Sequence, residues 1–185
     1  MIKEEEFKVR TIEKIGEEMC LAARTAPKGR GFDLLEIAIL KDGEIEKLSK
    51  KMKEIGERES HATFLRDAEN IKCASVIVLI GTKKKTIGLK YCSFCGWPTC
   101  TDAERAGAVC ALNTGDLGIA IGSAVSVAMD HRLDNRVMYS IGKAAIDLKL
   151  LGEEVAVAYG IPLSATGKNP FFDRPAYAQA SAGKK

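Results

Sequence analysis

The chain has 185 residues and lacks any long hydrophobic run. No segment approaches the roughly 18 consecutive apolar residues that a membrane-spanning helix needs. Residues 1–6 are mostly charged and lack the apolar stretch of a secretory signal. The formal net charge is only +3, too small for the electrostatic footprint of a nucleic-acid-binding protein. We therefore expect a cytoplasmic protein with neither a membrane nor a nucleic acid as its partner.

Histidine is also scarce, with only His61 and His131 in the whole chain. No Ser-His-Asp or His-Glu-x-x-His arrangement is present, which argues against hydrolytic chemistry. His131 follows an apolar helical stretch, so we expect it either to cap that helix or to line an active site. His61 follows a serine and is expected on the surface.

Cysteine, by contrast, is concentrated in one segment. Four of the six cysteines, Cys92, Cys95, Cys100 and Cys110, lie within 19 residues. Thiols stay reduced in the cytoplasm, so this spacing favours metal ligation over disulfides. Gly96 lets the backbone approach closely and Trp97-Pro98 turns it, as ligands that surround one centre require.

The spacing favours an iron–sulfur cluster over a zinc ion. A zinc site made of four cysteines usually has two short cysteine knuckles separated by a longer loop. Cys100 and Cys110 are too far apart in sequence to form a second knuckle. Zinc stays open as the alternative metal. Cys20 and Cys73 stand apart from the segment, and we expect both to be buried, inert thiols.

Hydrophobic periodicity predicts a mixed α/β or α+β fold around one sheet. One compact domain is expected over residues 1–185, with residues 91–111 as a cluster-binding insertion and residues 160–185 as an extended arm. The predicted helices cover residues 4–25, 45–55, 117–128 and 137–151, and the predicted strands cover 33–41, 74–81 and 155–159. Residues 61–69 are expected to form a short helical or irregular link. The strand over 74–81 is apolar throughout and should be buried on both faces. The helix over 117–128 carries small apolar residues and is expected to be central.

The run C-x2-C-G-x3-C from Cys92 to Cys100 resembles the four-iron cluster segment in the B subunit of Rnf electron-transport complexes. It also resembles the corresponding segment of corrinoid iron–sulfur proteins. The resemblance implies a [4Fe-4S] cluster, with Cys110 as the fourth ligand after Cys92, Cys95 and Cys100.

Residues 22–31, AARTAPKGRG, form a second candidate site. A helix ends here in a loop that carries basic side chains and two glycines. Glycines let backbone N–H groups approach a phosphate, and Arg or Lys neutralises its charge. The alternative is a basic turn exposed to solvent.

Nearly the whole chain resembles the nitroreductase-like proteins, and more closely a family of ferredoxin domain-containing proteins of unknown function. The segments that carry this resemblance are AARTAPKGRG, DAENIKCASVIVLIG, the cysteine segment, DLGIAIGSAVSVAMDHRLDNRVM and YGIPLSATGKNPFFDR. The resemblance implies an α+β fold, a nitroreductase-like α/β sandwich with a cysteine-rich insertion. It also implies a homodimer that binds FMN between its subunits. The residues implied in FMN binding are Arg24, Lys28, Gly29, Arg30, Gly31, Lys168 and Asn169.

The leading hypothesis is therefore a redox protein with a [4Fe-4S] cluster and FMN that exchanges electrons with a ferredoxin-like donor or acceptor. The chain departs from nitroreductases where Lys28-Gly29-Arg30 replaces the usual serine and asparagine. Two alternatives remain: a ferredoxin-like electron carrier without a substrate site, and a zinc-stabilised binding protein.

Overall fold

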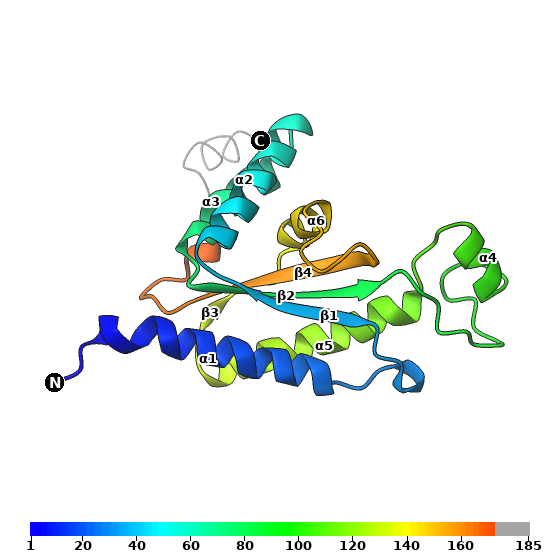
Figure 1. Cartoon of the computed structure of the whole chain (residues 1–185), viewed down its shortest axis with the longest axis horizontal. Coiled ribbons are helices and arrows are strands. Elements are labelled where there is room, and N and C mark those ends of the chain that lie inside the picture. The colour runs from blue at the N-terminus through cyan, green and yellow to red at the C-terminus, as the bar shows by residue number, and fades with distance from the viewer. Residues whose placement is uncertain (173–185) are drawn as a thin grey trace, which may run out of the picture.

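The chain folds into three layers, with a four-stranded sheet between two layers of helices (Figure 1). This computed structural model describes residues 1–172. The strand order is β1-β2-β4-β3 and every neighbouring pair is antiparallel. The strands are β1 (Leu35–Leu40), β2 (Val76–Lys83), β3 (Asp134–Asn135) and β4 (Val155–Ser164). The architecture confirms the α+β sandwich predicted from the sequence.

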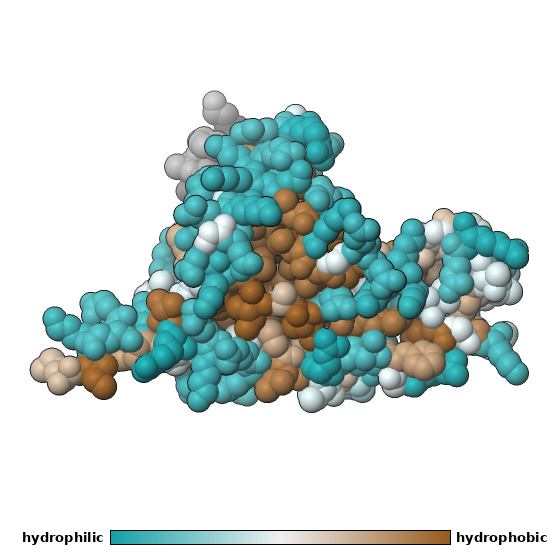
Figure 2. All heavy atoms as spheres, in the orientation of Figure 1, coloured by the Kyte–Doolittle hydropathy of each residue, from teal (hydrophilic) through white to brown (hydrophobic). Residues whose placement is uncertain are grey.

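β2 lies in the middle of the sheet and is buried on both faces, as its unbroken apolar run predicts. Its side chains alternate between two cores: Val78 and Ile80 face one helical layer, whereas Ile77 and Leu79 face the other. β1 forms one edge of the sheet. In the space-filling view, apolar side chains are visible along β1, between the more polar surfaces of the two helical layers (Figure 2).

One helical layer consists of α1 (Glu4–Thr25) and α5 (Ala111–Asp130), which pack side by side on the sheet. Alanines on α5 face Met19 and other buried side chains of α1, and their small size allows the two helices to approach closely. The buried residues of α5 that build this core are Leu117, Ala120, Ile121, Ala124 and Ala128.

The outer face of α5 is uncharged and exposed between Gly115 and Met129. Within one protomer, therefore, only the inner face of α5 is buried as expected for a central helix. Within residues 1–172, α5 is the one helix whose length and composition would allow it to cross a membrane. Core helices of soluble proteins meet the same criteria. In this structure α5 packs against α1 and β2.

The second helical layer covers the opposite face of the sheet and contains the other core. Its helices are α2 (Gly43–Arg58), α3 (Ala62–Asn70) and α6 (Tyr139–Asp147), with the short 3-10 helix η2 (Ile71–Cys73) leading into β2. Leu48, Met52 and Ile141 are fully buried between these helices and the sheet. The helices predicted from periodicity at α2 and α6 are confirmed, and α3 shows that the link over residues 61–69 is helical.

The prediction of an extended arm over residues 160–185 is wrong for its described part. β4 continues through residues 160–164, because five consecutive buried positions there pair with the central strand and the β3 edge. The 3-10 helix η3 (Pro170–Phe172) follows, and Phe171 is fully buried in the second core. Residues 173–185 of the predicted arm lie outside the described residues.

The cysteine segment projects from one end of the sheet (Figure 1). We call residues 84–110 the cysteine lobe; it connects the end of β2 to the start of α5 and contains the short helix α4 (Cys100–Arg105). The predicted placement between a buried strand and an apolar helix is therefore confirmed.

The contact of α6 with β4 allows no side chain at Gly142. A Cβ atom at this position would collide with the carbonyl oxygen of Ala158, which belongs to the sheet and has little room to move. We expect Gly142→Ala to lower the free energy of unfolding by about 3 kcal/mol, measured by urea denaturation. Gly43→Ala is the matched control because nothing lies near its Cβ position. Equal stability of the two variants would contradict this packing.

Candidate metal centre

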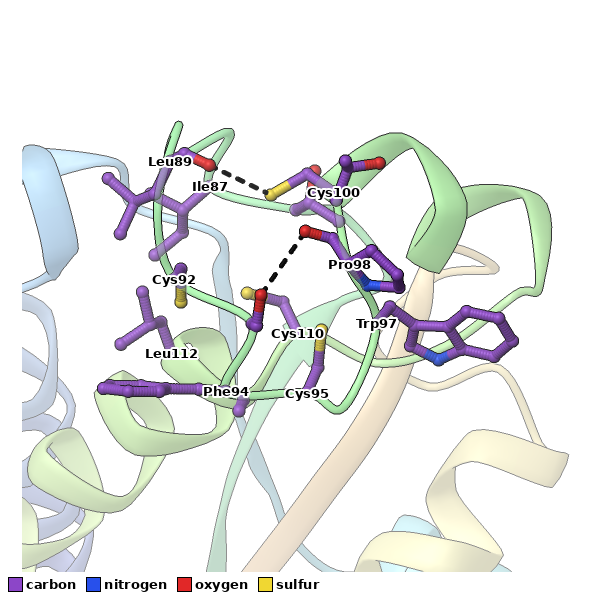
Figure 3. A pocket seen from close by; sticks show the side chains of 14 residues that line it. Ile87, Leu89, Cys92, Phe94, Cys95, Trp97, Pro98, Cys100, Cys110 and Leu112 are labelled. Atoms are coloured by element: carbon purple, nitrogen blue, oxygen red, sulfur yellow. Dashed lines mark hydrogen bonds between the residues drawn. The ribbon is translucent and has the colours of Figure 1, made fainter.

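Cys92, Cys95, Cys100 and Cys110 line a single pocket inside the cysteine lobe. Their sulfur atoms point toward its interior, whereas the rings of Phe94 and Trp97 extend away on either side (Figure 3). Cys110 is buried and the other three cysteines are partly exposed. The structure therefore brings together all four cysteines that the sequence predicts as ligands.

The loop between Cys92 and Cys100 owes its curvature to two residues with positive φ. Ser93 has a φ of 58° and Gly96 a φ of 83°, and the N–H of Gly96 donates to the carbonyl of Ser93 at 3.0 Å. The hydroxyl of Ser93 donates to the carbonyl of Pro98 at 3.3 Å, which closes the loop on itself. The φ of Gly96 is one that favours glycine, but nothing lies within 4 Å of its Cβ position, so glycine serves the turn here rather than the predicted close approach of the backbone.

Thr99 starts α4 and thereby sets the position of Cys100, the first residue of that helix. Its hydroxyl oxygen accepts from the N–H of Asp102 at 3.2 Å and donates to the Asp102 carboxylate at 2.6 Å. The spacing Thr-x-x-Asp is a recognisable capping signal, so this role is visible in the sequence, although the prediction missed it.

Cys110 is the N-cap residue of α5. The first turn of a long helix carries unpaired backbone N–H groups and a partial positive charge. Ala111 and Leu112 of this turn also line the pocket. This end of α5 therefore favours an anionic group held in the pocket beside it.

The walls of the pocket are largely apolar. Ile87, Leu89 and Leu112 are among the side chains around the thiols (Figure 3), and Ile87 is buried. Such walls limit water access and strengthen electrostatic interactions inside. Within residues 1–172, no three His, Cys, Asp or Glu side chains are grouped so that they hold a single metal ion. The four thiols instead surround the pocket as a whole.

The predicted basic loop lies next to the cysteine lobe. It forms the 3-10 helix η1 (Gly29–Gly31), in which Arg30 has a φ of 55°. The Arg30 guanidinium donates to the carbonyls of Ile87 and Gly88, at 3.2 and 3.3 Å. The N–H of Gly29 donates to the carboxylate of Asp116 on α5 at 2.9 Å. The loop is thus fastened to both ends of the lobe; Asp116 is a residue that the sequence analysis missed, since no local pattern marks it.

Lys28 and Arg24 hold the end of α1 in place. The Lys28 ammonium donates to carbonyls of Ala23, Arg24 and Ala26, which satisfies groups that a helix end leaves unpaired. Partial burial lowers the pKa of Lys28 below its usual value. Arg24 pairs with Asp33 at 2.7 Å and donates to the carbonyl of Leu35 at 3.1 Å. In the single protomer, therefore, the charged groups of Lys28 and Arg24 donate to backbone carbonyls of their own chain.

The segment between β4 and η3, which carries Lys168 and Asn169, lies at the other end of the sheet from η1 (Figure 1). β4 separates the two regions: its ten residues span roughly 33 Å. The carbonyl of Lys168 accepts from Thr166 at 2.6 Å, and the Asn169 side chain accepts from the N–H of Phe171 at 3.0 Å. Within one protomer the structure does not bring the two predicted FMN-binding groups together, and Gly31, at φ 71°, has open space around it.

Both histidines lie away from the cysteine pocket. His131 is the C-cap residue of α5, and its Nε2 lies 3.4 Å from the Glu18 carboxylate on α1. A helix of 20 residues, about 30 Å long, separates it from Cys110. The capping alternative is therefore confirmed for His131. His61 is exposed, as predicted, and its Nε2 lies 3.2 Å from the hydroxyl of Tyr139.

The two remaining cysteines differ from each other. Cys73 is exposed, so the expectation of a buried thiol is wrong there: it ends η2 at the surface, before the chain enters β2. Cys20 is partly buried against the first core. Burial, together with the charge of Glu17, raises the pKa of the Cys20 thiol to about 11.

Comparison with known proteins finds one matching family and one curated relative that spans nearly the whole chain. Residues 106–174 match the family described as "Uncharacterized protein containing a ferredoxin domain (DUF2148)". This range contains Cys110 but not the first three cysteines of the lobe. An uncharacterized protein of Archaeoglobus fulgidus is 39% identical over 183 residues, covering 94% of this chain and 97% of its own.

Solved structures with the same fold include nitroreductases. A nitroreductase with bound FMN from Bacteroides fragilis has a TM-score of 0.59 at 12% identity, over 88% of this chain and 82% of its own. Another, also with bound FMN, from Desulfitobacterium hafniense has a TM-score of 0.57 at 16% identity, over 90% and 85%. The predicted nitroreductase-like fold and the predicted ferredoxin-domain family are both confirmed.

The contrast between Cys20 and Cys73 predicts selective alkylation. With a pKa of about 11, only roughly one Cys20 thiol in a thousand is the reactive thiolate at pH 8. We expect iodoacetamide at pH 8 to label Cys73 rapidly and Cys20 very slowly, and the Cys20 rate to rise toward pH 11. Peptide mass spectrometry measures both sites in one sample. Equal labelling rates at pH 8 would contradict the burial of Cys20.

Proposed function

Because the chain belongs to the family of uncharacterized proteins containing a ferredoxin domain, we propose that it is a redox protein that holds a [4Fe-4S] cluster. The observation that carries this proposal is the convergence of Cys92, Cys95, Cys100 and Cys110 on one pocket. Thiolate ligation by four cysteines is the usual way in which proteins bind such clusters.

The surroundings of the thiols support an anionic cluster. A cluster with four thiolate ligands carries net negative charge, and the first turn of α5 offers a partial positive charge beside Cys110. Ile87 and Leu89 give the site an apolar lining on their side, and the polarity around a cluster tunes its reduction potential. Zinc is the alternative occupant, and metal analysis distinguishes the two.

FMN is the second proposed cofactor. The support is the fold shared with nitroreductases whose crystal structures contain bound FMN. Arg24, Lys28, Gly29, Arg30 and Gly31 of one protomer would face Lys168 and Asn169 of its partner, because β4 keeps the two groups far apart within one chain. An iron–sulfur cluster supplies one-electron transfer and a flavin supplies two-electron chemistry, so together they suit an oxidoreductase.

The exposed apolar surface of the α1–α5 layer supports a homodimer. Leu21 of α1 and Ile119 and Met129 of α5 are at least half exposed. Gly118 and Gly122 lie on the same outer face of α5 and leave room for close approach by a second helix. Association of two copies through this face would cover side chains that are costly to leave in water.

A cytoplasmic location and a ferredoxin-like electron donor or acceptor complete the proposal. Reduced thiols are maintained in the cytoplasm, and the partly exposed Cys92, Cys95 and Cys100 leave the site open to an external electron carrier. In this scheme the first turn of α5 stabilises the anionic cluster held beside it, and Arg30 holds η1 against the lobe.

A ferredoxin-like electron carrier without a flavin or substrate site is the second candidate. The observation that favours it concerns Lys28, Arg24 and Arg30, whose cationic groups donate to backbone carbonyls of their own chain. These side chains would have to exchange such contacts for contacts with a phosphate before they could bind FMN.

The cluster is tested by removing one ligand. Anaerobically purified protein should be brown and contain about four iron atoms per chain, whereas Cys95→Ala should lose both iron and visible absorbance because three thiolates no longer close the coordination. Cys73→Ala, which removes an exposed cysteine outside the lobe, should keep both. Colourless wild-type protein with one zinc per chain would refute the cluster.

The intersubunit flavin is tested by placing a charge on the outer face of α5. Ile119→Lys should weaken the dimer at least about a hundredfold, since it buries an unpaired charge in the interface. Light scattering should then detect monomers, and the yellow FMN released by acid precipitation should fall while iron content stays constant.

Val137→Lys is the control, because Val137 is exposed to a similar extent but lies outside α1 and α5. A monomeric Ile119→Lys protein that still binds one FMN per chain would contradict a flavin site shared between subunits. Wild-type protein without FMN would favour the simple electron carrier.

A further inference from the structure

Three large aromatic side chains of the cysteine lobe are exposed, and two of them, Phe94 and Trp97, line the cysteine pocket. Tyr91 is 99% exposed, Phe94 75% and Trp97 40%. They stand within seven consecutive residues and flank Cys92 and Cys95 in the sequence. Figure 3 shows Phe94 and Trp97 on opposite sides of the inward-pointing sulfur atoms. Large aromatics at a surface are characteristic anchors of protein interfaces.

The same lobe carries an excess of unpaired positive charge. It contains four cationic residues and two carboxylates. Asp102 accepts from Thr99 at the α4 cap, and Glu104 accepts from Thr86 at 2.6 Å. Within residues 1–172, none of the four cations has a carboxylate within ion-pair distance, in contrast to Lys83, which pairs with Glu36 and Glu154. The four are Lys84, Lys85, Lys90 and Arg105.

We propose that this aromatic and basic rim, Tyr91, Phe94 and Trp97 with Lys84, Lys85, Lys90 and Arg105, is the docking surface for a small acidic electron-transfer protein. The inference rests on the proposed cluster and specifies the partner by its chemistry. In the docked complex a reduced carrier gives up one electron and the cluster site accepts it; the reverse transfer returns it to an oxidised carrier.

The positive charge and the exposed aromatic rings of the rim favour a protein as its occupant. Unpaired lysines attract an acidic partner and raise the association rate, while aromatic rings beside the pocket offer apolar contact without specific hydrogen bonds. Weak, transient complexes of this kind suit a carrier that must bind and leave quickly. Phe94 and Trp97 of the rim line the pocket that holds the three partly exposed cysteines, so a protein that contacts these rings would lie beside the cluster site.

Two other occupants, a membrane surface and a second copy of this chain, would contact side chains of the same kinds. An anionic membrane surface also attracts aromatic and basic side chains, and a second copy of this chain would also cover exposed rings. Neither explains why the rim coincides with the cysteine pocket.

The first experiment reverses charge on the rim. The probe is an acidic bacterial ferredoxin with two [4Fe-4S] clusters. We expect the variant Lys85→Glu/Lys90→Glu to bind it at least about tenfold more weakly by calorimetry at low salt. The rate of electron transfer from the reduced probe, followed by stopped-flow absorbance, should fall by a similar factor. The wild-type rate should decrease steeply with salt, and the variant rate should do so less.

The matched control is Lys47→Glu/Lys53→Glu, which makes the same change of net charge at two exposed lysines on α2. Its affinity and rate should stay within about twofold of wild type, because it lies away from the rim. Tyr91→Ser should weaken binding about tenfold without loss of stability, since the ring is fully exposed. Iron content is measured for every variant.

The possible results distinguish failure of the docking surface from failure of the proposed cluster. Rim and control variants with equal affinity and full iron content would overturn the docking surface and leave the cluster intact. Absence of iron in wild type would instead refute the proposed function. Binding of wild type to phosphatidylserine vesicles without binding to the ferredoxin would identify a membrane surface and overturn the proposal. Dissociation of a wild-type dimer by Tyr91→Ser would identify a subunit interface and also overturn it.

Discussion

The start of α5 is the junction on which the candidate site depends. Cys110 caps this helix at the pocket, Asn113 donates its buried side-chain N–H to the carbonyl of Lys85 as the chain leaves β2, and Asp116 accepts from Gly29 of η1. These contacts join three segments that are far apart in sequence. The helix itself is held by Leu117 and Ala120, which are buried against α1 and the sheet, so the packing of the core and the geometry of the lobe are inseparable.

This arrangement places the two candidate redox elements next to each other. Arg30 connects η1 to the Ile87–Gly88 turn, and that turn forms part of the lobe whose pocket contains the cysteines. Such proximity suits a protein that transfers electrons between two centres, because the electron then passes between neighbouring groups without a conformational change. The outer face of α5 and the rim of the lobe remain exposed on the same protomer, which leaves separate surfaces for a second copy and for an electron carrier.

Much of the fold could be predicted because hydrophobic periodicity is a local signal. The continuous apolar run of β2 and the stripes of α1 and α2 identified these elements correctly, since each of them buries a face that its own residues define. β3 was missed because two residues carry no periodicity, and its pairing with β4 is a long-range contact. Cys73 was misplaced because a buried apolar strand follows it closely in the sequence, whereas η2 brings the thiol itself to the surface.

The sequence by itself determined the class of fold and the close spacing of four thiols beside a strand that must be buried, from which the proposed sulfur-ligated centre follows. Only the tertiary structure decided how the remaining polar residues are used. Lys28 and Arg30 read as anion ligands in the sequence, yet the structure shows them bound to backbone carbonyls. The physical reason is that a cation bonds to whichever acceptors lie nearest in space, and for Arg30 these acceptors come from residues 57 and 58 positions further along the chain.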